Sequence, residues 1–327
     1  MVPPGSRQAL SADPNIPSTG FGENILGEIA ESAPVRLPDL ATIFNRRAER
    51  LKALAPGHEL EGFLRVIAAL VAAQQEALAG LPPGSLPGSA EIAKAKLAHR
   101  APLDPSTWRR DESWRVALAR ILEKIDTGVL PEAAQEARKA LATAAATDLE
   151  ALADRFLEGD VPPGEAAKAV FVAAALQVAW TRMAALMEAS DLDAADAGHC
   201  PACGSPPVAG MISPGGTKFG HRHLHCSLCA TAWRYVRVRC VHCGSTDKIS
   251  FRQLAGTSYL RAECCANCQG YSKVFYPESA KALEPLADDL GSLGLDVLVG
   301  EEGFARVANP FVLGVMVRHD GRHDGNN

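Results

Sequence analysis

Four Cys-x-x-Cys pairs between residues 200 and 268 constrain the fold of this chain more than any other feature of its sequence. Two residues between cysteines allow a tight turn to direct both sulfurs at one metal ion. Twenty-two residues separate the first pair from the second, 21 separate the third from the fourth, and only ten separate the second from the third. This internal repeat predicts two tandem tetrahedral sites. The predicted ligands are Cys200, Cys203, Cys226 and Cys229 at site one, and Cys240, Cys243, Cys265 and Cys268 at site two.

Other assignments stay open at this point. A crossed arrangement, in which the first and third pairs share an ion, requires a longer detour of the chain. The ninth cysteine, Cys264, precedes Cys265 on a predicted strand, so its side chain is expected to face the other way, as a packed or free thiol. The cysteines already fill two tetrahedra, so the neighbouring histidines are interpreted as supporting or surface residues, with transient metal capture left open. These histidines are His199, His221, His223, His225 and His242.

Spacing alone does not choose the metal, because a tetrahedron of four sulfurs accepts zinc or iron. The turns CPACG at 200–204 and CVHCG at 240–244 resemble rubredoxin knuckles, which hold a single iron. Zinc ribbons use similar turns, and zinc is the more frequent occupant of such structural sites. On spacing alone, two zinc ions are therefore favoured.

Short alternating segments between the pairs predict β-hairpins. Residues 208–212 and 221–225 flank one turn-rich stretch, and residues 249–255 and 258–263 flank another. Residues 231–239 alternate well enough to predict a strand that links the two sites. Such modules have little apolar core, so the metals are expected to supply much of their folding free energy.

The charge of the cysteine-rich region is consistent with metal-thiolate sites. Residues 200–268 contain eight Lys and Arg residues against Asp247 and Glu263, a formal charge of +6. Four thiolates around a divalent ion leave a charge of about −2 at each site, so the loaded module carries only about +2. The whole chain carries −5. Neither value favours binding to nucleic acid.

The first half of the chain is predicted to be helical. Apolar residues recur there at three- and four-residue spacing, as in the run from Phe63 to Val71. Pro- and Gly-rich breakers divide residues 23–190 into about six or seven helices. After Pro277, Leu286, Leu290, Leu293 and Val297 share one face of a predicted C-terminal helix. No phosphate-binding loop or catalytic motif is found in the helical half, so it is interpreted as a scaffold or docking surface.

Neither the N-terminus nor the most apolar segment predicts membrane insertion. Residues 1–22 lack a basic region followed by an apolar stretch, so they are interpreted as a flexible leader rather than a signal peptide. The segment from Val170 to Trp180 is short, rich in alanine and contains Gln177, which favours a buried core helix. A cytoplasmic location is expected, where cysteines are more often reduced metal ligands than disulfides.

The predicted fold class is α+β. An all-α domain at 23–195 is expected to precede tandem rubredoxin- or zinc-ribbon-like β modules at 196–277. A C-terminal helix and tail at 278–316 is expected to pack on the body. Residues 317–327 are polar and are predicted to be disordered.

Four sequence segments resemble those of a known family. The stretches CPACGSPPVAGM, HCSLCATAWRYVRVRCVHCGS and RAECCANCQGYSK, together with the tail ADDLGSLGLDVLVGEEGFARVANPF, are similar to the formate dehydrogenase accessory protein FdhE family. The helical half resembles that family in architecture and length. The resemblance implies a cytoplasmic maturation factor with two rubredoxin-like iron sites, which shifts the expected metal from zinc to iron. It also implies that the eight paired cysteines are the ligands, and it gives Cys264 no role.

The function expected from this resemblance is non-catalytic assembly of respiratory formate dehydrogenase, through binding of its catalytic subunit. Two other classes remain: a zinc-ribbon protein that binds nucleic acid, and a rubredoxin-like electron carrier. No triad, carboxylate pair or cofactor loop is found that would indicate an enzyme in its own right.

Overall fold

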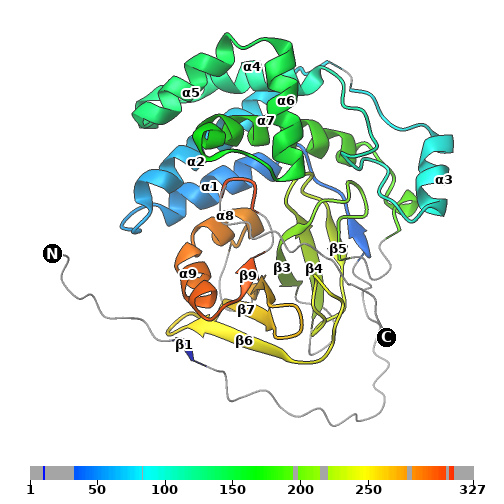
Figure 1. Cartoon of the computed structure of the whole chain (residues 1–327), viewed down its shortest axis with the longest axis vertical. Coiled ribbons are helices and arrows are strands. Elements are labelled where there is room, and N and C mark those ends of the chain that lie inside the picture. Colours follow the sequence, from blue (N-terminus) through cyan, green and yellow to red (C-terminus); the bar gives the residue numbers. More distant parts are fainter. Residues whose placement is uncertain are drawn as a thin grey trace.

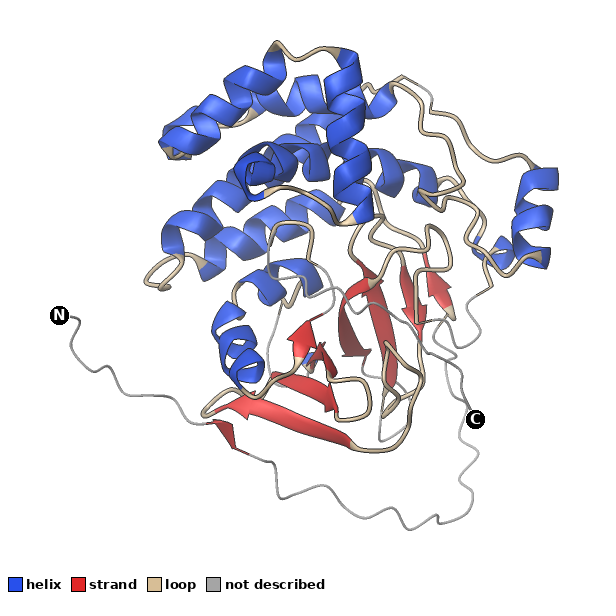
Figure 2. Cartoon of the chain, in the orientation of Figure 1, coloured by secondary structure: helices blue, strands red, loops and turns tan. Residues whose placement is uncertain are grey.

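The computed structural model describes residues 10–11, 33–82, 84–193, 198–213, 220–277, 282–306 and 309–312. Helices occupy the first half of the chain and strands gather in the second half, so the α+β class is confirmed (Figures 1 and 2). The predicted disordered end at 317–327 lies outside the described residues, and so does the predicted leader at 1–22, apart from residues 10 and 11.

Helices α1, α2 and α4 to α7 form a layer above the sheet, and α3 lies apart from them (Figure 1). Helix α7 lies at the centre of this layer and packs against α2, α4, α5 and α6. Its alanines allow the neighbouring helices to approach closely, and almost every side chain from Phe171 to Ala184 is buried. The helices are α1 (Ile43–Leu54), α2 (Glu61–Leu78), α3 (Ser89–Leu97), α4 (Ser113–Lys124), α5 (Glu132–Ala142), α6 (Ala146–Glu158) and α7 (Ala166–Ala185).

The segment from Val170 to Trp180 lies within α7 and forms the core of this domain, as the sequence predicted. Its one strongly polar residue, Gln177, is 1% exposed and is hydrogen-bonded on both sides. No helix within the described ranges is long and apolar enough to cross a membrane.

Two three-stranded units follow the helices. The first ribbon contains β3 (Pro207–Ser213), β4 (His221–Cys226) and β5 (Ala232–Arg234); the second contains β6 (Ile249–Leu254), β7 (Leu260–Cys265) and β8 (Gly270–Phe275). Within each ribbon the strands run antiparallel. Strands β3 and β8 pair in parallel, so the two ribbons merge into one sheet with the order β1-β6-β7-β8-β3-β4-β5-β2.

Three short strands complete this sheet in the described part of the chain. They are β1 (Leu10–Ser11), β2 (Val35–Arg36) and β9 (Ala305–Arg306). Strand β1 pairs with β6, and β2 pairs with β5, so N-terminal residues lie at both ends of the strand order. Strand β9 pairs with β8 in parallel and lies off that path.

Both predicted hairpins are present, but the predicted strand at 231–239 is wrong in length. Strand β5 ends at Arg234. The chain then leaves the sheet, because the Tyr235 hydroxyl donates to the Cys240 carbonyl at 2.9 Å and Val238 takes a positive φ of 56°. A β-branched residue rarely adopts that conformation, and it is incompatible with an extended strand. Alternation in the sequence cannot reveal this turn, which depends on a contact with the third cysteine pair.

The C-terminal segment is helical, as expected, but it forms two helices. These are α8 (Pro285–Leu290) and α9 (Leu293–Glu301), and the chain breaks between them at Gly291 and Ser292. The predicted common face is therefore wrong: Leu286 and Leu290 are buried on α8, whereas Val297 is 62% exposed. Leu295 and Val299 provide the buried face of α9 instead.

Two acidic residues, one just before α8 and one within it, connect the C-terminal segment to the helical layer. Arg47 lies 3.0 Å from Glu284, and Arg50 lies 2.6 Å from Asp288. Because Arg47 and Glu284 are almost fully buried, this pair is poorly screened by solvent. The two pairs hold α8 against α1.

A second, buried charge network connects the same segment to the sheet. Lys273 on β8 lies 2.5 Å from Asp296 and 3.2 Å from Asp289. Arg306 pairs with the same two carboxylates, and Tyr271 donates to Asp296 at 2.5 Å. The two positive and two negative charges of this network balance. Charged side chains that are buried this deeply require such pairing. The C-terminal helices therefore bridge the helical layer and the second ribbon.

Candidate metal centres

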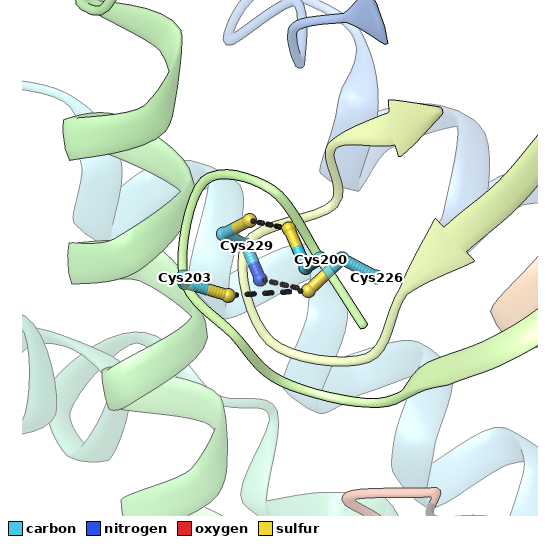
Figure 3. Close-up of side chains that lie close together, drawn as sticks. All are labelled: Cys200, Cys203, Cys226 and Cys229. Carbon is cyan, nitrogen blue, oxygen red and sulfur yellow. Dashed lines mark hydrogen bonds between the residues drawn. The ribbon is translucent and has the colours of Figure 1, made fainter. Parts of the chain in front are cut away.

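The structure gathers the eight paired cysteines into two groups of four. The groups contain the first and second pairs and the third and fourth pairs, so the tandem arrangement is present and the crossed one is not. In site one the Cys200 and Cys229 sulfurs are 3.5 Å apart and the Cys203 and Cys226 sulfurs 3.4 Å apart (Figure 3). In Figure 3 the four sulfurs face one another from two separate turns.

These separations fit a metal ion. A tetrahedron with metal–sulfur bonds of about 2.3 Å has edges of about 3.8 Å. In site two the Cys240 and Cys268 sulfurs are 3.6 Å apart, and the Cys243 and Cys265 sulfurs 3.8 Å apart. All these distances far exceed the bond length of a disulfide, which is about 2.05 Å. The donor set therefore suits two thiophilic ions.

Corresponding turns present the sulfurs at both sites. The Cys200 amide donates to the Ser205 carbonyl at 2.9 Å, and the Gly204 amide donates to the Cys200 carbonyl at 2.8 Å. The third pair repeats this pattern between Cys240, Gly244 and Ser245. The second and fourth pairs lie in the hairpin turns β4–β5 and β7–β8. Each ribbon thus brings one loop turn and one hairpin turn together.

The residue after each pair adopts a left-handed conformation. It is glycine after the first and third pairs, but alanine or glutamine after the other two. The φ values are 73° at Gly204, 58° at Ala230, 71° at Gly244 and 56° at Gln269. This conformation costs a residue with a Cβ about 1–2 kcal/mol, whereas glycine adopts it without strain. Two of the four turns therefore carry backbone strain.

We expect Gly204→Ala and Ala230→Gly to change stability in opposite directions. A Cβ at Gly204 would lie 3.6 Å from Asp104, an ordinary contact, so the substitution should cost only the backbone strain, about 1 kcal/mol. Ala230→Gly removes the same kind of strain and should raise the free energy of unfolding by up to about 1 kcal/mol. Urea denaturation of the metal-loaded protein measures both. A loss of stability in both variants would contradict the assignment.

Site one is held against the helical layer. The Leu103 amide donates to the Ala202 carbonyl at 2.9 Å, between the cysteines of the first pair. The Gln177 side chain donates to the Ser227 carbonyl at 2.7 Å, and the Gln74 side chain donates to Gln177 at 3.1 Å. A hydrogen-bonded path therefore runs from α2 through α7 to the second pair. Sequence reasoning did not assign this role to Gln177, although a polar residue inside an apolar helix was its signal.

The two sites differ in exposure. All four cysteines of site one are buried. At site two Cys243 is exposed and Cys268 is partly exposed, while Cys240 and Cys265 are buried. The Asn267 side chain lies 3.7 Å from the Cys243 sulfur and donates toward it. Site two is therefore the one that solvent and other molecules can reach.

A chelator is expected to remove the metals in two phases, first from site two and then from site one. A chelator must reach the ion, and only site two has an exposed ligand, Cys243. The measurement is the metal content of protein sampled during incubation with EDTA. The variant Cys240→Ser/Cys243→Ser should show only the slow phase. Release of both ions in a single phase from the unmodified protein would contradict the difference in exposure.

The protonation of the cysteine thiols determines how each site would hold an ion. Burial raises the pKa of the Cys200 and Cys226 thiols. Burial acts in the same direction on Cys229, but hydrogen bonds from the neighbouring cysteines outweigh it and lower its pKa. At site two burial is likewise outweighed at Cys243, where the Ser245 amide is the main opposing donor, and the pKa falls to about 7. Each site thus favours one thiolate, and a bound ion displaces the remaining protons.

Cys264 and the histidines lie outside both sulfur groups. The Cys264 side chain is fully buried on β7, with its sulfur 3.9 Å from the Ala262 carbonyl. Among the residues that the structure describes, no histidine joins either group. Nε2 of His223 lies 3.3 Å from the Ala33 carbonyl, and Nε2 of His242 lies 3.4 Å from the Tyr271 carbonyl. These two rings are partnered with backbone rather than with the sulfur groups.

Comparison with known protein families covers nearly all of the described chain. The models for the FdhE N-terminal, central and C-terminal domains match residues 32–196, 199–237 and 238–313. The chain belongs to the FdhE family. The boundary between the family's central and C-terminal models separates site one from site two.

Relatives and a solved structure agree with this assignment. The FdhE homologue of Proteus mirabilis is 36% identical over 287 residues, which cover 85% of this chain and 91% of that protein. The homologue of Pseudomonas aeruginosa is 39% identical, covering 81% and 87%. The crystal structure of the FdhE protein from Pseudomonas aeruginosa superimposes with a TM-score of 0.75 at 35% identity, covering 86% of this chain and 98% of that one. The family and the fold therefore agree.

Proposed function

We propose that this FdhE-family chain is a non-catalytic assembly factor for respiratory formate dehydrogenase, and that it acts in the cytoplasm by binding the catalytic subunit of that enzyme. The observation that carries the proposal is family membership along nearly the whole chain, together with both groups of four cysteines. A family match to one ribbon alone would support the presence of a metal site but not an assembly role. Here the helical layer and the C-terminal helices belong to the same match.

The arrangement of the sites supports a structural role for one metal and an accessible position for the other. At site one an ion would be enclosed by Cys200, Cys203, Cys226 and Cys229, and a buried structural ion stabilises the fold around it. At site two an ion would lie behind the exposed Cys243. An assembly factor that tests the redox state of its surroundings would use the second position.

We propose iron as the metal at both sites, with zinc as the alternative. The four-sulfur donor sets accept either ion. Elemental analysis and the visible spectrum of protein purified without oxygen distinguish the two. Two iron equivalents with a coloured sulfur-to-iron spectrum would support iron, and a colourless protein with two zinc equivalents would overturn it.

Direct binding tests the proposed partner. The purified chain should bind the isolated catalytic subunit of formate dehydrogenase, measured by calorimetry or surface plasmon resonance. Cells that lack the chain should still make the catalytic subunit but should lose most formate dehydrogenase activity. Normal activity in such cells, or no binding in vitro, would contradict the assembly role.

The exposure of Cys243 favours one second candidate, a rubredoxin-like electron carrier. Electron transfer requires that a redox centre approach its partner closely, and site two meets that condition. This function predicts a reversible one-electron couple at site two and turnover with a reductase. Iron-loaded protein without such a couple would exclude it.

A further inference from the structure

A pocket of about 670 Å³ lies where the end of the helical layer meets the first ribbon. Four separate segments form it: residues 34–35, residues 189, 190 and 192, residues 220–222 and residues 234–237. A volume in this range holds several side chains, and junctions between structural units are common sites of binding. Neither metal site contributes a cysteine to it.

The chemistry of the pocket is basic on one side and apolar on the other. Arg237 and His221 contribute nitrogen donors to it. Arg234 and Arg222 line it as well, and the buried Arg222 is paired with Glu263. No carboxylate occurs among the described residues that line the pocket. This contrasts with the net charge of −5 on the chain. The pocket between α1 and α8 has Asp39 and Glu284 in its lining as well as arginines.

Apolar side chains form the rest of the wall. Val35, Leu192, Tyr235 and Val236 line the pocket, and Val236 is 48% exposed at its rim. Arg237, its neighbour in the chain, is also exposed, so an apolar and a basic side chain lie next to each other at the rim. This rim can accept an apolar side chain and an acidic one from the same peptide.

Contacts within the chain position this wall. The Tyr235 hydroxyl donates to the Cys240 carbonyl at 2.9 Å, and the Tyr235 ring lies near two guanidinium groups, at 5.6 Å from Arg222 and 6.0 Å from Arg239. Val238 keeps a positive φ of 56° next to this rim. Backbone strain of this kind persists where the surrounding structure fixes it, and it concentrates at functional sites. A preformed wall lowers the entropy cost of binding.

We propose that this pocket docks an extended segment of the partner protein that combines acidic and apolar residues. The partner's carboxylates would lie against Arg237 and His221, and an apolar side chain of the partner would pack on Val236 and Tyr235. This inference rests on the proposed function, in which the partner is the catalytic subunit of formate dehydrogenase. It adds to that function the surface of this chain that binds the partner and the chemistry of the partner segment that binds there.

Binding of the purified catalytic subunit to two variants and two matched controls tests the proposal. Arg237→Glu and Val236→Ser alter exposed rim residues, and each should weaken binding by about tenfold or more. Val297→Ser changes a valine on α9 that is 62% exposed and does not line the pocket. Lys248→Glu reverses an exposed charge elsewhere in the module. Both controls should bind as the unmodified chain does, and added salt should weaken the unmodified complex.

The outcomes separate this inference from the proposed function. If the unmodified chain does not bind the catalytic subunit, both fail. If it binds and the rim variants bind equally well, the docking pocket is wrong while the assembly role stands. A photo-crosslinker placed at Val236 should capture a partner segment that contains Asp or Glu. Capture of a basic segment, or of residues 12–32 of this chain in place of the partner, would overturn the proposal.

Discussion

Replacing Cys200 and Cys203 together with serine is expected to leave one metal equivalent of two and to unfold the first ribbon. The structure groups these cysteines with Cys226 and Cys229, and all four are buried. A structural ion of this kind contributes an apparent 10–16 kcal/mol or so in small zinc domains, as much as the whole stability of a typical domain. Without the ion, four buried sulfur or hydroxyl groups would remain inside the ribbon with no metal to bind.

Metal analysis of the purified variant and its thermal unfolding measure this result. The unfolding temperature should fall strongly, because β3 pairs with β8 and its loss exposes the edge of the second ribbon. Cys264→Ser is the matched control: Cys264 is buried but lies in neither sulfur group, so this variant should keep two equivalents. Loss of both ions from the double variant would indicate that the two sites are coupled.

Replacing Arg222 with alanine is expected to destabilise the protein by about 3–5 kcal/mol, because it leaves a buried charge without its partner. Arg222 on β4 is 1% exposed, and its guanidinium lies 2.6 Å from Glu263 on β7. It also donates to Ser272 on β8 at 3.2 Å. To reach them it passes Gly210 on β3, where a Cβ would lie only 3.0 Å from the Arg222 side chain. This one side chain therefore spans four strands and joins the two ribbons.

The destabilisation should depend on pH. Burial raises the pKa of Glu263, and Arg222 is the main group that opposes the rise. Without Arg222 the pKa of Glu263 in the folded protein rises further. The folded protein then binds more protons than the unfolded protein, so the free energy of unfolding falls as the pH rises. The part of the penalty that comes from the unpaired charge should be absent at pH 4, below the ordinary value of 4.5, and present at pH 8. Urea denaturation at these two pH values measures it.

A double substitution separates the ion pair from general loss of packing. Arg222→Met/Glu263→Leu removes both charges and keeps much of the volume, so it should recover most of the stability. It should not show the pH-dependent penalty between pH 4 and pH 8, because Glu263 is gone. If the double variant is as unstable as Arg222→Ala, packing of the arginine stem, rather than the unpaired charge of Glu263, would account for the loss.

Much of the candidate site follows from short-range patterns. The turns around Cys200 and Cys240 depend on residues only a few positions apart, so the sequence CxxCGS predicts them directly. The nearly equal separation of the two cysteine pairs within each half of the repeat predicts the grouping of the cysteines that the structure shows. The buried core helix at 170–180, within α7, was likewise predicted from a short, alanine-rich apolar segment. In each case the information lies within one segment or in a repeated length.

Three other features of the structure could not be predicted from such short-range patterns. Strand β5 ends early because Tyr235 contacts the Cys240 carbonyl, and the C-terminal helix breaks after Leu290. The pairing of Arg222 with Glu263 joins strands that are far apart in the chain. Each depends on a neighbour that only the assembled fold supplies, and alternation or periodicity carries no information about that neighbour.

The sequence by itself determined the eight paired cysteines, their division into two groups of four, and the succession of a helical half and a β half. It could do so because knuckle turns and helices are encoded by residues a few positions apart. Only the tertiary structure decided that the ribbons share one sheet through β3 and β8, that site one is buried against α7, and that Cys243 leaves site two exposed. Two repeats of nearly equal length look alike in sequence, and what distinguishes them is the surface on which each one packs.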